Sequence, residues 1–171
     1  MDYLGPTSLD VAITGLIQTR NTSTLTPIAP DAAPVMRVYG DDGGLNETAT
    51  LSLKDTGVVT DASNASPIVI TSAAHGLQVG MRVVVASVGG NTAANGTWTI
   101  SAVTDDTFTL SGSTGNGSYT SGGTWHVLGL YLLTITPTAG NGYSEGVTYN
   151  GLVSWAVSSV AQNSLFNFTV V

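Results

Sequence analysis

Apolar and polar residues alternate with a period of two over most of this chain. In residues 147–158, one side of an extended strand is apolar, and Asn150 and Ser154 fall on the other side. The apolar side consists of Val147, Tyr149, Val153, Trp155 and Val157. The same alternation recurs in TATLSLKD, TWTISAV and LFNFTVV, whose Thr, Val and aromatic residues fit a pleated sheet. Long helical periodicity is absent, so the pattern predicts an all-β protein.

Turn signals separate these stretches at short intervals, as is typical of sandwiches and barrels. Asn95-Gly96 lies between RVVVASV and TWTI and predicts the end of a hairpin. Asp105-Asp106 predicts a second tight reversal, and residues 113–123 (STGNGSYTSGG) predict a glycine-rich loop or bulged hairpin. Residues 29–34 (APDAAP) are expected to be extended, because proline restricts its own φ and the residue before it.

Short strands with close turns fill the middle of the chain, and longer strands flank them on both sides. We therefore expect two domains. An outer β-sandwich would be built from residues 1–62 and 127–171, and a small β-barrel, residues 63–126, would be inserted into it as a projecting knob. Such an insertion is tolerated where two host strands end close together, and its loop-closure cost rises slowly with length.

Few charged residues are available to cover the surface. Of the 171 residues, 42% are hydrophobic and 9% are charged, so Thr, Ser, Asn and Gly must supply most of the polar surface. The formal net charge is −7. The basic residues Arg20, Arg37, Lys54 and Arg82 are scattered singly. Because binding to nucleic acid or an anionic membrane needs clustered positive charge, we expect neither as a partner.

The chain contains no cysteine, which excludes disulfides and thiol chemistry. The first residues, MDYLGPTSLD, lack the positive and apolar regions of a signal peptide. No apolar run approaches the roughly 20 residues of a membrane helix. We expect a protein that is made and folded in a cytoplasm and is stabilised by packing or by packing and assembly.

His75, beside Gly76 in SAAHGLQVGMRVVV, is the first candidate for chemistry. As a base or metal ligand it would need an orienting acid, a nucleophile or further ligands. The other histidine, His126, is distant in sequence, and no HxH or HExxH spacing occurs. We favour a structural role, in which Gly76 supplies a positive φ and the imidazole bonds a nearby backbone carbonyl and braces the next turn.

The densest acidic group is Asp41, Asp42 and Glu47 in YGDDGGLNET. Carboxylates could hold Ca²⁺, but the spacing does not match an EF-hand loop, and we expect a solvated hairpin turn instead. The glycine-rich residues 113–123 lack the Lys and the following helix of a phosphate-binding loop. We therefore predict no catalytic, cofactor-binding or metal-binding residues.

Four aromatic residues share faces with other apolar residues and are assigned to the core. They are Trp98, Trp155, Phe166 and Phe168. The rival interpretation is a glycan-binding platform, and it requires exposed aromatic side chains around residues 113–125.

The segments TSAAHG, NGTWTI, DDTFTL and YTSGGT follow one another within residues 65–125, about a third of the chain. In this order they resemble a small β-barrel module that recurs in virion proteins of tailed bacteriophages. The flanking stretch GLYLLTITPTAGNGYSEGVTYNGL, with its aromatic-rich last strand, resembles the Ig-like fold of phage capsid or tail accessory proteins. The resemblance implies an Ig-like β-sandwich with an inserted small β-barrel in a virion structural protein.

From this resemblance we expect a capsid cement or decoration protein that is not an enzyme. It would be a homotrimer on the capsid surface, binding across neighbouring major capsid protein subunits. The alternatives are a phage tail, adaptor or fibre-base component, distinguished by a low copy number, and a host-surface glycan-binding module. An enzyme such as a depolymerase is least favoured, because it would need paired carboxylates across a cleft.

Overall fold

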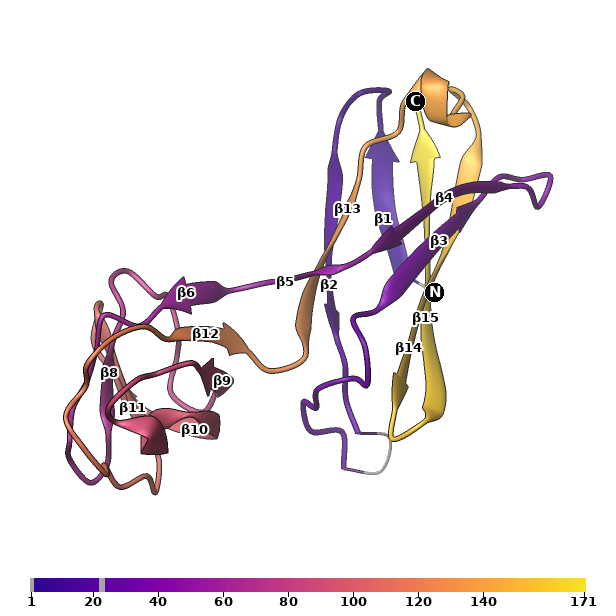
Figure 1. Cartoon of the computed structure of the whole chain (residues 1–171). Coiled ribbons are helices and arrows are strands. Elements are labelled where there is room, and N and C mark those ends of the chain that lie inside the picture. Colours follow the sequence, from indigo (N-terminus) through magenta and orange to yellow (C-terminus); the bar gives the residue numbers. More distant parts are fainter. Residues whose placement is uncertain (1, 22–23) are drawn as a thin grey trace. The chain divides into compact units, whose positions relative to one another are not determined.

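The computed structural model describes residues 2–21 and 24–171, and these residues form an all-β protein (Figure 1). The predicted fold class is confirmed at this level. The chain divides into two compact units. Unit 1 comprises Met1–Ser52 and Gly129–Val171, and unit 2 comprises Leu53–Leu128. None of the helices described is long and apolar enough to cross a membrane.

Unit 1 contains a five-stranded sheet in the order β1-β15-β14-β3-β4. Its strands are β1 (Asp2–Thr7), β15 (Val160–Val170), β14 (Thr148–Val157), β3 (Val35–Tyr39) and β4 (Leu45–Thr50). β1 pairs with β15 in parallel, and the other neighbours are antiparallel. A three-stranded sheet has the order β2-β13-β5, with β2 (Ile13–Gln18), β13 (Leu130–Ile135) and β5 (Ser52–Leu53).

One hydrophobic core joins these two sheets. The apolar halves of the alternating strands meet there, as Met36 and Val38 of β3, Leu133 of β13, and Val153 of β14 are all buried. The two sheets therefore pack face to face around alternating side chains. The more specific Ig-like assignment stays a prediction.

Unit 2 contains a seven-stranded sheet in the order β6-β12-β9-β10-β11-β8-β7. Its strands are β6 (Thr56–Val58), β7 (Asp61–Ala62), β8 (Val69–Thr71), β9 (Arg82–Ala86), β10 (Gly96–Val103), β11 (Thr107–Leu110) and β12 (Thr124–Val127). The two end strands, β6 and β7, follow each other directly along the chain, so the sheet curls into a half-barrel. At the corner between them, the Val59 N–H donates to the Gly123 carbonyl and the Thr60 N–H donates to the Thr71 carbonyl.

The boundary of the inserted unit differs from the expected one. We expected the insertion to begin at residue 63, whereas unit 2 begins at Leu53. The reason is strand pairing, because β6 pairs with β12 and β7 pairs with β8. At its other end the unit extends to Leu128 instead of residue 126. Residues 53–62 mix polar and apolar residues without a clear alternation, so their own pattern did not indicate the sheet that they join.

Candidate functional site

His75 is buried in unit 2, with 8% of its surface exposed, and both of its ring nitrogens contact the backbone. Nδ1 accepts a hydrogen bond from the Leu77 N–H at 2.9 Å, so the ring proton must lie on Nε2. Nε2 lies 3.0 Å from the Thr107 carbonyl oxygen and donates to it. Gly76 has a φ of 64°, the conformation that permits this reversal. The predicted bond to a carbonyl and the predicted positive φ are both confirmed.

The surroundings of His75 are aromatic. Its ring meets Phe108 edge-on at a centroid distance of 5.3 Å and Trp125 at 6.4 Å. The Trp125 Nε1–H donates to the Ser72 hydroxyl at 2.8 Å. The imidazole thus joins its own turn to β11 through a hydrogen bond and a ring contact, and to β12 through a ring contact. This arrangement holds a turn, and within residues 2–21 and 24–171 no carboxylate forms an ion pair with the ring.

The acidic residues of the β3–β4 hairpin do not converge. Asp42 accepts the Gly44 N–H at 2.7 Å within the turn. Glu47 lies on β4 and accepts the Tyr143 hydroxyl proton at 2.9 Å. Burial and the Glu47 carboxylate raise the pKa of Tyr143 well above its usual value. Within residues 2–21 and 24–171, no three His, Cys, Asp or Glu side chains are grouped as a metal site would require.

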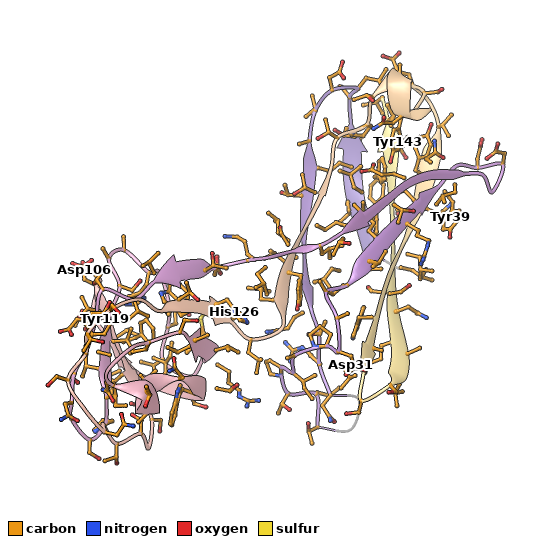
Figure 2. All side chains as sticks on the ribbon, viewed as in Figure 1. Asp31, Tyr39, Asp106, Tyr119, His126 and Tyr143 are labelled. Carbon is orange, nitrogen blue, oxygen red and sulfur yellow. The ribbon has the colours of Figure 1, made fainter. Side chains whose placement is uncertain are left out.

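Another acidic residue, Asp31 in the proline-bearing residues 29–34, has a role that the sequence did not indicate. Its carboxylate accepts the N–H groups of Ser158 and Ser159 at 2.9 and 2.7 Å (Figure 2). These two residues form the tight turn between β14 and β15 with positive φ values of 51° and 64°. Asp31 therefore stabilises a turn that ordinarily favours Asn and Gly.

The glycine-rich residues 113–123 are bonded to the half-barrel and do not form a cradle. Asn91 is fully buried, and its side chain accepts the Asn116 N–H at 3.1 Å while donating to the Ser63 carbonyl at 2.9 Å. The Tyr119 hydroxyl lies 3.0 Å from the Gly122 carbonyl. Trp125 is only 2% exposed. Tyr119 is half-buried, so Trp125 and Tyr119 do not form a fully exposed aromatic pair.

The four aromatic residues assigned to the core differ in depth. Phe166 and Phe168 are buried in the core of unit 1. Trp155 is half-buried and packs against the same core. Trp98 is half-buried in unit 2, where its Nε1–H donates to the Ala94 carbonyl at 2.8 Å.

The outer face of the five-stranded sheet is almost uncharged. We define this outer face by the residues that alternate with the buried ones on its strands. They are Tyr3, Pro6, Val35, Arg37, Tyr39, Leu45, Thr48, Thr50, Thr148, Asn150, Leu152, Ser154, Ala156, Ala161, Asn163, Leu165, Asn167 and Thr169. Arg37 is the one charged member of this set, and Tyr3 and Leu165 are 60% and 46% exposed. The outer face thus contains Tyr and Arg but no Lys, Asp or Glu, and this composition is typical of the centre of protein–protein interfaces.

The rows of the outer face are fixed by strand register. Tyr3 is level with Asn167, Asn167 with Asn150, and Asn150 with Tyr39. Leu165 and Leu152 form the next row. Strand spacing makes the face roughly 20 Å wide and roughly 20 Å long, or about 400 Å² in projection. This is about half of the roughly 800 Å² that each partner contributes to a standard interface.

Comparison with known proteins adds little to this geometry. No protein family matches the chain, and no curated protein matches it. One solved structure with which it shares distant structural similarity is described as a phage phi92 endosialidase. The sequences are 14% identical, with a TM-score of 0.31. The match covers 98% of this chain but only 27% of the other, and at this TM-score it carries no argument about function.

Proposed function

We propose that this chain is a non-catalytic structural component of a tailed-phage particle that joins neighbouring subunits. The observation that carries the proposal is the almost uncharged outer face of unit 1, on which Arg37 is the one charged residue. A partner can desolvate a face of this composition at little electrostatic cost. Its area is too small for a tight single contact, so symmetric repetition would supply the affinity.

The candidate chemical groups support the non-catalytic part of the proposal. His75 uses both ring nitrogens to hold the backbone of a turn. Asp42 is engaged within its hairpin, Glu47 with a tyrosine, and Asp31 with the β14–β15 turn. A general base needs a free lone pair within reach of a substrate proton. In His75 the lone pair of Nδ1 already accepts the hydrogen bond from the Leu77 N–H.

The phage setting is supported by the resemblance of residues 65–125 to a module of virion proteins. Two places in the particle fit a subunit-joining protein. As a capsid cement protein it would form a homotrimer that binds across neighbouring major capsid protein subunits. As a tail, adaptor or fibre-base component it would act at a few positions only.

Quantitative mass spectrometry of purified particles tests the proposal. The expected result is that the chain co-purifies with the particle at a fixed ratio to the major capsid protein. Hundreds of copies per particle would favour the cement role, and a handful would favour the tail. Absence of the chain from purified particles, with the chain present in the infected cell, would refute the proposal.

A further inference from the structure

A groove lies along the free side of β6 in unit 2. It has a volume of about 650 Å³ and runs between β6 (Thr56–Val58) and residues 72–74. Ser72, His75 and Trp125 line its floor. We call it the β6 groove. Gly57 lies directly against the floor, because a Cβ at this position would be 2.6 Å from ring atoms of Trp125.

The backbone of β6 presents unused hydrogen-bonding groups to this groove. Pairing with β12 uses the odd-numbered residues, as the Val127 N–H donates to the Asp55 carbonyl and the Val59 N–H donates to the Gly123 carbonyl. In an antiparallel ladder, alternate residues point their N–H and C=O groups to opposite sides. Thr56 and Val58 therefore direct their backbone groups away from β12 and into the groove.

The opposite wall does not bond to these groups. The Thr60 N–H donates to the Thr71 carbonyl, and after this point the two segments diverge. The Ser72 and Ala74 N–H groups are directed instead to the carbonyl and carboxylate of Asp106. Throughout the described ranges, no backbone hydrogen bond joins residues 56–58 to residues 72–74. The half-barrel is thus open here by the width of the groove.

The lining indicates the chemistry of an occupant. Lys54 and Asp55 are its charged residues, and they form an ion pair with each other, so the groove has no net charge to neutralise. Ser72, Ala73 and Ala74 are small and leave room for side chains that point inward. Val58 is 63% exposed at the rim and offers an apolar contact. Unpaired strand edges are recognised by extended peptides, which add a strand to the sheet.

We propose that the β6 groove binds an extended, uncharged segment of a different polypeptide, which pairs with β6 as an added strand. The occupant's backbone would bond to Thr56 and Val58, and its small or β-branched side chains would face the Trp125 floor. This inference deepens the proposed function and rests on it, since the segment would belong to a neighbouring protein of the particle. It supplies unit 2 with a contact independent of the outer face of unit 1.

Amide hydrogen exchange followed by NMR on the full chain tests this directly. In the free protein, the amides of Thr56 and Val58 should exchange at least tenfold faster than those of Gly57 and Val59. Equal protection of all four amides would overturn the proposal. The probe is a set of acetylated and amidated seven-residue peptides, in which Ser or Thr alternates with Val, Ala or Gly. At millimolar concentration, at least one should slow exchange at Thr56 and Val58 tenfold or more.

Two controls identify the backbone as the recognised group. A fully N-methylated copy of the binding peptide should have no effect, because it has no N–H donors and its methyl groups prevent the close approach of two paired strands. Val58→Pro removes a donor that faces the groove, leaves the β12-facing N–H groups of Gly57 and Val59 in place, and should abolish peptide binding. Thr56→Pro is a second such variant with a different side chain replaced. Unchanged exchange with every peptide would refute the proposal. Peptide binding that survives both proline variants would also refute it. A change of oligomeric state caused by Val58→Pro would refute it as well, because the occupant would then be a second copy of this chain. None of these results bears on whether the chain is found in particles.

Discussion

Replacing His75 separates a structural histidine from a catalytic one. His75→Ala removes the acceptor of the Leu77 N–H and the donor to the Thr107 carbonyl, and it empties the space beside Phe108. His75→Asn retains an acceptor at the position of Nδ1, and His75→Gln retains a donor near that of Nε2. His75→Ala therefore removes both hydrogen bonds, His75→Asn removes the bond to Thr107, and His75→Gln removes the bond from Leu77.

The expected cost can be worked out from these contacts. Leu77 is 5% exposed, so its orphaned N–H costs about 1–3 kcal/mol. The bond to the half-buried Thr107 carbonyl is worth about 0.5–1.5 kcal/mol, and the edge-on ring contacts contribute a similar amount. His75→Ala should therefore destabilise unit 2 by roughly 4 kcal/mol, a large part of the roughly 5–15 kcal/mol that stabilises a domain. The Asn and Gln variants should each lose roughly half as much.

The tryptophans allow each unit to be followed separately in urea. Indole N–H signals of Trp98 and Trp125 report on unit 2, and that of Trp155 reports on unit 1. His75→Ala should lower the midpoint of the unit 2 signals by roughly 2–3 M urea and leave the Trp155 midpoint unchanged. A unit 2 midpoint within a few tenths of a molar of the wild type would refute the structural role, because a histidine kept for chemistry can be removed at little cost in stability.

Three further changes test other parts of the account. Gly151→Ala places a Cβ 1.9 Å from the Phe166 ring and should cost unit 1 about 2–3 kcal/mol; an unchanged Trp155 midpoint in urea would contradict this packing. Ser159→Gly relieves a positive φ of 64° and should raise the free energy of unfolding of unit 1 by about 0.5–1 kcal/mol, whereas a loss of stability would contradict the turn geometry. Burial lowers the pKa of His126 from its usual 6.5, so the unfolded chain takes up a proton first as the pH falls, and stability present above pH 6.5 is lost below it. His126→Gln should therefore lose less unit 2 stability than the wild type between pH 7.5 and 5 in urea titrations, and equal losses would count against this effect.

Local patterns predicted the strands and several turns, because alternation and turn chemistry act over a few residues. The period of two in residues 147–158 matches β14, in which Tyr149 and Val153 are buried and Asn150 is exposed. Asp105-Asp106 does form the reversal between β10 and β11. The His75-Gly76 turn was predicted for the same reason, since its Gly and its imidazole–backbone bond are characteristic of a strand end.

Features that depend on distant residues could not be predicted in this way. The Ser158-Ser159 turn has neither Gly nor Asn, and it is held by Asp31, which lies 127 residues earlier in the chain. The parallel pairing of β1 with β15 joins the two ends of the chain. The outer face of unit 1 likewise follows from the register of strands that are far apart in sequence, and single-strand patterns show only which side of each strand is polar.

Competitive incorporation into particles tests most directly whether the outer face of unit 1 joins neighbouring subunits. Leu165→Lys places a charge on this face at an exposed position, where the fold should tolerate it. Val79→Lys, at a position 60% exposed in unit 2, is the matched control. When each variant is supplied together with the wild type during assembly, mass spectrometry of purified particles should find Leu165→Lys depleted at least tenfold and Val79→Lys at its supplied ratio. Incorporation of Leu165→Lys at its supplied ratio would contradict the account.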